Sequence, residues 1–217
     1  MAGMEVRLID WEGGGYKVTD KPHPRGEIVL GGKPVARGYY KNKEKTLEDF
    51  FVENGTQFFK SGDIGQLLPD GTIRLIDRKK DLVKLQLGEY VSLGKVEAQM
   101  KTNPLVDNIC VYADPFKTHT VALIVPEKGV LQKIAASLNK LGTFDNLCKD
   151  SELVQVLLKS LMDHGKSQGL KKFEIPTVIR LCPEPWVPES GLVTAAFKLK
   201  RKALQSAFQS EIDQMYE

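Results

Sequence analysis

Two charged residues in the first half of the chain could bind a small polar ligand. Asp63 stands between two glycines in SGDIG, and Arg78 ends the segment TIRLIDR. A carboxylate beside glycines meets a ligand with little steric crowding, and the arginine fork supplies complementary N–H donors. Together they could hold a diol such as that of a ribose. Alternatively, Asp63 is a turn residue, and Arg78 forms a salt bridge with Asp77 or Asp81.

A third residue with possible chemistry is Lys198, in the segment GLVTAAFKLKRKAL. This segment predicts a loop before a helix, from which a long cation could reach phosphate oxygens and stabilise their charge as it shifts. The alternative is the basic start of a helix on a solvated face. Lys200, Arg201 and Lys202 are interpreted in that second way.

Two further positions are candidates for movement and for ligand approach. The run Lys79, Lys80 and Asp81 coincides with a change from β-rich to mixed composition, and exposed charges with few contacts suit a hinge. A solvated charge run is the alternative. Gly88 follows an apolar segment and would let an extended ligand pass close to the backbone, or it makes only a turn.

The elements that must position these residues divide the chain into two parts. Residues 1–79 are predicted to be β-rich, with strands over 5–10 and 26–32 and a hairpin turned at PDG. Residues 80–217 are predicted to be α+β. The predicted fold class of the whole chain is therefore α+β, with a β-rich first part.

The second part carries three kinds of pattern. The segments VDNICVYAD, HTVALIVPE and PTVIRLCP predict strands rich in Val and Ile. Ser92 can cap a helix that ends before Pro104. Further helices are predicted from KGVLQKIAASLNKLG, ended by its glycine, from SELVQVLLKSLMDHGKSQG, and from KRKALQSAFQSEIDQMYE.

Composition excludes several classes of function. With 31 Lys+Arg against 28 Asp+Glu, the net charge of +3 implies no general affinity for nucleic acid or anionic membrane. The three cysteines, Cys110, Cys148 and Cys182, form no CxxC pair and no cluster with histidine, which supports neither a metal site nor a disulfide framework. No apolar run approaches the ~18 residues of a transmembrane segment.

Several segments together resemble long-chain acyl-CoA synthetases of the adenylate-forming superfamily. The resemblance covers essentially the whole chain and is carried by FFKSGDIGQLLPDGTIRLIDRKKDLVKLQLGEYVSLGKVE, DKPHPRGEIVLGG, GYYKNKEKT, FEIPTVIRL and PEPWVPESGLVTAAFKLKRKAL. The chain looks most like the branch that prefers arachidonate and other long fatty acids. The resemblance implies a two-step ligase: fatty acid and ATP give acyl-adenylate and pyrophosphate, and the CoA thiol then displaces AMP.

The resemblance also implies a role for each candidate residue. Asp63 and Arg78 would bind the ribose hydroxyls, Lys80 would be the hinge, and Lys198 would be the catalytic residue of adenylation. Gly88 and its neighbours would face the pantetheine tunnel for CoA. ATP and Mg²⁺ are the implied cofactors, with the magnesium ligands expected outside this chain, so no residue is assigned to a metal.

The resemblance has departures at several positions, among them Leu87. Phe197 stands where many members of the superfamily have Gly, a feature that the long-chain branch shares. Ala195 stands where close relatives usually have Asp. Tyr90 replaces an Arg of many relatives, so no phosphate contact is assigned to it.

The chain has no glycine-rich phosphate loop, no adenine and magnesium motif and no fatty-acid tunnel of the family's kind. We therefore expect residues 1–79 to be the tail of the large adenylation domain and residues 80–217 the mobile C-terminal lid, inactive alone. Its partners would be fatty acid, ATP and CoA, without nucleic acid. The parent enzyme would face the cytosol on endoplasmic reticulum, mitochondrial or other intracellular membranes.

Two other functions stay open at this point. One is a different adenylate-forming enzyme that activates aryl acids or loads a carrier protein. The other is a non-enzymatic module whose basic cluster around Lys198 binds anionic lipid or nucleic acid.

Overall fold

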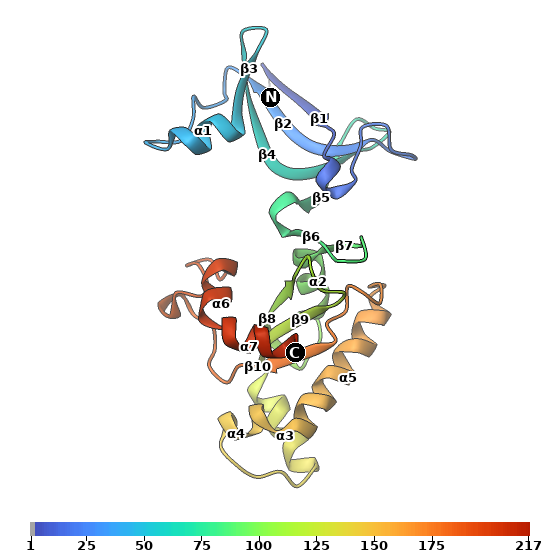
Figure 1. Cartoon of the computed structure of the whole chain (residues 1–217), viewed down its shortest axis with the longest axis vertical. Helices are drawn as coiled ribbons and strands as arrows, with labels where there is room; N and C mark the ends of the chain where they lie inside the picture. Colours follow the sequence, from blue (N-terminus) through green and yellow to red (C-terminus); the bar gives the residue numbers. More distant parts are fainter. Residues whose placement is uncertain (1–2) are drawn as a thin grey trace. The chain divides into compact units, whose positions relative to one another are not determined.

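The structure, a computed structural model, describes residues 3–217 and divides the chain into two compact units (Figure 1). Unit 1 extends to Leu82, and unit 2 runs from Val83 to Glu217. The change in composition predicted a boundary between residues 79 and 80. The interpretation of the two parts as a domain tail and a mobile lid stays a prediction.

Unit 1 is built on an antiparallel sheet in the order β1-β2-β4-β3, with β5 paired to the second half of the long strand β4. The strands are β1 (Met4–Ile9), β2 (Arg25–Gly32), β3 (Phe50–Glu53), β4 (Thr56–Leu67) and β5 (Ile73–Arg78). The predicted strands over 5–10 and 26–32 are confirmed as β1 and β2. The predicted PDG hairpin joins β4 to β5, where Leu68 N–H donates to the Thr72 carbonyl at 2.9 Å.

The core of unit 1 is small and requires a close approach of backbone to an aromatic ring. Ile28, Val29, Phe58 and Ile64 are buried. A β-carbon at Gly31 would collide with the ring of Phe58. Glycine at this position of β2 therefore lets the adjacent strand β4 pack its largest buried side chain.

A short helix in unit 1, α1 (Lys43–Asp49), was not predicted from the sequence. Asn42 caps it, because its side-chain oxygen accepts the N–H of Lys45 at 3.0 Å. Lys45 then forms ion pairs with Glu48 and Asp49 one turn further on. The absence of buried residues in α1 explains why no hydrophobic period marked it.

Unit 2 contains a three-stranded sheet in the order β10-β9-β8, in which β8 and β9 are antiparallel and β10 is parallel to β9. A separate ribbon pairs β6, whose first residue Leu82 is the last of unit 1, with β7. The strands are β6 (Leu82–Lys84), β7 (Tyr90–Ser92), β8 (Val106–Ala113), β9 (Thr120–Pro126) and β10 (Val178–Leu181). The helices are α2 (Leu93–Met100), α3 (Lys128–Ser137), α4 (Phe144–Lys149), α5 (Ser151–Ser167), α6 (Arg201–Ala207) and α7 (Gln209–Met215).

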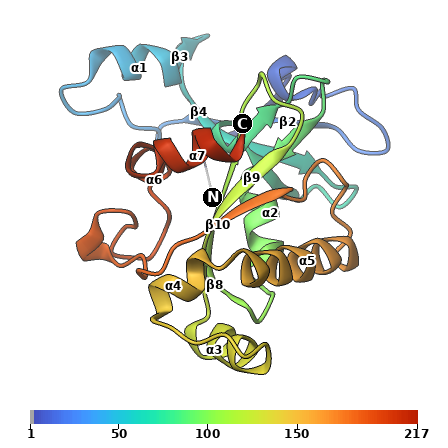
Figure 2. The same cartoon turned by 60° about the horizontal axis from the view of Figure 1, so that its bottom comes forward.

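Side chains on the two faces of this sheet pack into two separate hydrophobic cores. Ile124 and its alternate neighbours on β9 pack with α2, α3, α4 and α5, whereas Leu123 and Val125 pack with α6 and α7. Figure 2 shows α5 on one side of the strands and α6 and α7 on the other. Since successive side chains of a strand point to opposite faces, the continuous apolar run of β9 is buried on both sides.

The predicted strands and helices of unit 2 are mostly confirmed, with differences at helix ends. Ser92 caps α2 as predicted by accepting the N–H of Lys95. The prediction that a glycine ends α3 is wrong: α3 stops at Ser137, and Asn139 takes the left-handed conformation at φ 56°. The final predicted helix is divided into α6 and α7 at Phe208, whose φ and ψ of −119° and 24° leave the helical region. The short helix α4 was not predicted.

Candidate functional site

The structure brings Asp63 and Arg78 together in unit 1. The register of β4 and β5 places the two residues directly opposite each other, and Arg78 Nε donates to Asp63 Oδ1 at 2.9 Å. Their side chains are 29% and 52% exposed, so both remain accessible to a ligand. The hydrogen bond with Asp63 and its charge raise the pKa of Arg78 above its usual value. Asp77 instead accepts the backbone N–H of Arg78 at 2.8 Å.

The backbone before Asp63 is held by hydrogen bonds to β2. Ser61 Oγ donates to the carbonyl of Ile28 at 2.7 Å and accepts the N–H of Asp63 at 3.1 Å. Gly62 lies at φ 74°, a conformation that glycine adopts without strain. The SGD segment is therefore a fixed bend in the middle of β4, with its carboxylate on an accessible surface.

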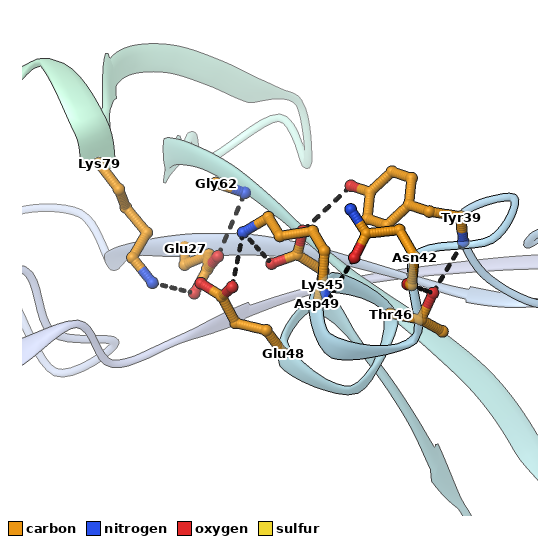
Figure 3. Close-up of polar contacts among 9 residues, drawn as sticks. All are labelled: Glu27, Tyr39, Asn42, Lys45, Thr46, Glu48, Asp49, Gly62 and Lys79. Carbon is orange, nitrogen blue, oxygen red and sulfur yellow. Dashed lines mark hydrogen bonds and ion pairs between the residues drawn. The ribbon is translucent and has the colours of Figure 1, made fainter.

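A buried carboxylate behind this bend, Glu27, was missed by the sequence analysis. Glu27 on β2 is 3% exposed. Its two oxygens accept the N–H of Gly62 at 3.2 Å and the ammonium of Lys79 at 3.0 Å (Figure 3). A charged residue inside the alternating pattern of GEIVLGG was the available signal, because a glutamate on a buried strand needs a partner. Glu27 thus joins the Asp63 bend to the end of β5.

Lys80, the predicted hinge, lies in a single 3-10 turn, η2 (Lys79–Asp81), close to the boundary between the units. Its side chain is exposed. The preceding residue is fixed in unit 1, because Lys79 pairs with Glu27 and its ammonium lies 5.5 Å from the centre of the Trp11 ring. The anchored Lys79 therefore directly precedes Lys80, and the role of Lys80 as a hinge stays a prediction.

Gly88 lies in the tight loop between β6 and β7. Its N–H donates to the Leu85 carbonyl at 2.9 Å, and the N–H of Leu85 donates to the Glu89 carbonyl at 2.8 Å. Gly88 has φ 96°, and a β-carbon there would meet no atom within 4 Å. Both interpretations of this glycine therefore fit: the turn requires its conformation, and the space over its backbone is open.

Lys198 projects from a short hairpin in unit 2. Val193 and Leu199 form a bridge at its base, and Thr194 N–H donates to the Lys198 carbonyl at 2.8 Å. The spacing of Thr194 and Lys198 has a structural reason, since Thr194 Oγ1 also accepts the N–H of Lys198 at 3.1 Å. The Lys198 side chain is exposed, and within residues 3–217 its ammonium has no hydrogen bond or ion pair.

The interpretation of Arg201 as part of a solvated face is wrong. Its side chain is 26% exposed, and its two terminal nitrogens donate to Glu97 of α2 at 2.7 and 2.6 Å. It also lies beside Cys110, whose thiol pKa is raised to about 12, first by burial and then by the charge of Glu97. Lys200 and Lys202 are exposed, as interpreted.

The arrangement offers a preformed carboxylate and guanidinium pair in unit 1 and, as far as residues 3–217 show, an unpaired ammonium in unit 2. The first can exchange its mutual hydrogen bond for bonds to vicinal hydroxyls, and the second can stabilise phosphate charge. In the part of the chain that is described, no group of three or more His, Cys, Asp or Glu side chains could hold a metal ion. None of the described helices has the length and hydropathy that a membrane crossing requires.

Curated relatives of the chain are long-chain acyl-CoA synthetases. The chain is 53% identical over 213 residues to long chain acyl-CoA synthetase 8 of Arabidopsis thaliana, covering 97% of this chain and 30% of that protein. It is 41% identical to long-chain-fatty-acid–CoA ligase 1 of Schizosaccharomyces pombe, covering 98% and 31%. The chain thus spans less than a third of the length of these relatives, and no protein-family model matches it.

Solved structures with the same fold are adenylate-forming domains. The adenylation domain of a carboxylate reductase from Mycobacterium chelonae is 32% identical, with a TM-score of 0.84, covering 99% of this chain and 31% of that one. A carboxylic acid reductase domain from Segniliparus rugosus, solved with AMP and a carboxylic acid, is 30% identical with a TM-score of 0.85, covering 99% and 32%. An anthranilate CoA ligase, 22% identical with a TM-score of 0.61 over 95% and 33%, shows the fold alone.

Proposed function

Because the chain belongs to the long-chain acyl-CoA synthetase family as a C-terminal segment about 30% of its relatives' length, we propose that it is part of an ATP-dependent long-chain fatty acid–CoA ligase. The complete enzyme would convert fatty acid, ATP and CoA into acyl-CoA, AMP and pyrophosphate through an acyl-adenylate. The observation that carries the proposal is the accessible Asp63–Arg78 pair, fixed by the register of β4 and β5 at 2.9 Å.

Asp63 and Arg78 are proposed to bind the ribose of ATP. An ionised carboxylate accepts hydrogen bonds from both hydroxyls of a vicinal diol, and the guanidinium donates to the hydroxyl oxygens. Ser61 and Glu27 hold the bend that carries Asp63, so binding of the ribose costs little conformational entropy there. The related domain from Segniliparus rugosus, solved with AMP, supports this choice of ligand.

Lys198 is proposed to be the catalytic residue of the first step. Negative charge shifts onto the phosphate oxygens as the fatty-acid carboxylate attacks the α-phosphorus of ATP and pyrophosphate leaves. An ammonium without a protein partner can stabilise that charge without first breaking an ion pair. Mg²⁺ would neutralise further phosphate charge, held by ligands that we propose to lie outside this chain.

Gly88 and its neighbours are proposed to form the face used in the second step. The CoA thiol would attack the acyl carbonyl of the adenylate and release AMP, with its pantetheine arm passing over the open backbone of Gly88. Lys80, one residue beyond the anchored Lys79, would be the pivot on which unit 2 turns between the two steps. The preference for arachidonate-like acids and the association with intracellular membranes stay predictions.

The experiment that tests this function is a product assay on the full-length protein that contains this chain. Incubation with ATP, CoA and a long-chain fatty acid should yield acyl-CoA and equal amounts of AMP and pyrophosphate. The purified 217-residue chain should yield none. Product formation only with aryl acids or with a carrier-protein thiol would instead support another adenylate-forming enzyme. Failure of every acid, together with salt-sensitive binding to many anions, would support the non-enzymatic module.

A further inference from the structure

We propose that Glu97 and Arg201 form a positioning pair that sets where the hairpin of Lys198 holds its ammonium. The inference rests on the proposed role of Lys198 in adenylation. It gives a function to two residues that touch neither nucleotide nor thiol in the scheme above. The pair joins α2 to the first residue of α6, which begins directly after the hairpin.

The contacts of this pair are more specific than a surface ion pair requires. Arg201 Nη1 and Nη2 donate separately to the two oxygens of Glu97, at 2.7 and 2.6 Å. Arg201 Nη1 also donates to the carbonyl of Val111 at 3.2 Å, while Glu97 Oε1 accepts the N–H of Val111 at 2.8 Å. The carboxylate and the guanidinium therefore bind each other and also both bind the backbone of Val111 in β8. A lysine ammonium cannot reproduce this geometry.

The pair lies where a small displacement would reach Lys198. The hairpin is bounded by the Val193–Leu199 bridge, and Val193 is fully buried. The N–H of Lys200 donates to the Leu192 carbonyl at 2.9 Å, so the hairpin and the start of α6 share a backbone path of only a few residues. Any shift of Arg201 is therefore passed to the hairpin base.

The tip of the hairpin is strained, which indicates that its surroundings hold it in place. Phe197 has φ 56°, a conformation unfavourable for an aromatic residue, and its side chain is 60% exposed. Local burial of Phe197 therefore does not stabilise this conformation. A strained residue persists where the surrounding structure fixes it, and the bonds at the hairpin base and the Glu97–Arg201 pair supply that constraint.

Stability alone is a weak reason for such a pair. The two side chains are 12% and 26% exposed, and the desolvation of a largely buried ion pair offsets much of its attraction. Orientation is the stronger reason, because displacing a catalytic group by about 1 Å can slow a reaction about 100-fold.

The test uses the full-length protein and measures the two half-reactions separately. Arg201→Lys keeps the charge and removes the two-pronged geometry, and Glu97→Gln keeps the shape and one accepting oxygen. Both should lower the kcat of adenylation about 10- to 100-fold. The KM for ATP should stay unchanged, because the proposed ribose ligands belong to unit 1. Thioester formation from supplied acyl-adenylate should be spared, and the double variant should lose little more than the worse single one.

Lys202→Gln is the matched control, since Lys202 is an exposed cation next to Arg201, and it should leave both half-reactions unchanged. Unaltered adenylation in both test variants would overturn the proposal, as would an equal loss in both half-reactions, which marks a merely structural role. Lys198→Ala is assayed in parallel. If that variant adenylates normally, the assigned role of Lys198 fails, an outcome distinct from failure of the positioning pair.

Discussion

In unit 1 the exposed charges of Asp63 and Arg78 meet each other at 2.9 Å, whereas in unit 2 the exposed ammonium of Lys198 meets no partner among residues 3–217. The first arrangement suits a binding pair whose geometry must be preorganised before its ligand binds. The second suits a charge that acts only when phosphate oxygens are within reach, because no ion pair has to be broken first.

Each unit also holds a mostly buried glutamate that accepts hydrogen bonds from a backbone N–H and from a basic side chain. Glu27 accepts hydrogen bonds from the Gly62 N–H and the Lys79 ammonium, and Glu97 accepts them from the Val111 N–H and the Arg201 guanidinium. The difference lies in the base: Lys79 makes a single contact at 3.0 Å beside the predicted hinge, whereas Arg201 makes two. The bidentate contact of Arg201 with Glu97 fixes the orientation of the two side chains, whereas the single contact of Lys79 with Glu27 fixes only the distance between the two groups.

The largest expected effect tests whether Lys198 acts in adenylation alone. Lys198→Ala in the full-length protein should slow adenylation about 100- to 1,000-fold, because the charge that develops on phosphate loses its cation. Thioester formation from supplied acyl-adenylate should be unchanged. Lys200→Ala, which removes a neighbouring exposed cation, is the control. Equal losses in both half-reactions would contradict the assignment of Lys198 to adenylation.

A smaller effect is expected when the ribose ligand is changed. Asp63→Asn should raise the KM for ATP about 10- to 100-fold, since hydrogen bonds to a charged acceptor are worth about 1.5–3 kcal/mol. The free energy of unfolding should fall by less than about 1 kcal/mol, because the pair with Arg78 is exposed. Steady-state kinetics and denaturant titration measure the two quantities. A large loss of stability without a change in KM would place this pair in the scaffold instead.

The buried partner should show the opposite behaviour. Glu27→Gln leaves the Lys79 ammonium without its counter-charge, and we expect the free energy of unfolding to fall by about 1–3 kcal/mol. Glu53→Gln, which breaks the half-exposed pair with Arg7, should cost less than about 1 kcal/mol. Urea titration of the same preparation compares the two. Equal costs would show that burial of Glu27 does not decide its contribution.

The smallest expected effect concerns the loop of Gly88. Gly88→Ala should destabilise by about 1 kcal/mol, because the left-handed conformation at φ 96° disfavours any β-carbon, although no atom would clash with it. Gly129→Ala, in α3, meets only the Glu127 carboxylate and should be neutral or stabilising. Thermal unfolding distinguishes the two variants. A fall in the rate of thioester formation that the lost free energy of unfolding does not account for would favour the proposed passage of CoA over this turn.

Residue periodicity predicted the elements that have a buried face. The strands β2, β8 and β9 and the helix α5 follow from their apolar patterns, because these patterns record which side chains leave water. The helix α2 was predicted instead from its Ser92 cap and from Pro104. The short helix α1 has no buried residue and escaped prediction. The end of α3 was misplaced, because Asn139, and not the predicted glycine, adopts the left-handed conformation that follows the helix.

The sequence by itself determined which residues are candidates for chemistry: Asp63 between its glycines, Arg78 at a strand end, Lys198 in its basic segment and Gly88 after its apolar run. Only the tertiary structure decided their partners. It placed Asp63 opposite Arg78, assigned Lys79 to Glu27, and moved Arg201 from a supposed solvated face to Glu97. The physical reason is distance along the chain: local patterns record burial and turns, whereas an ion pair between residues 97 and 201 depends on how a whole sheet and its helices pack.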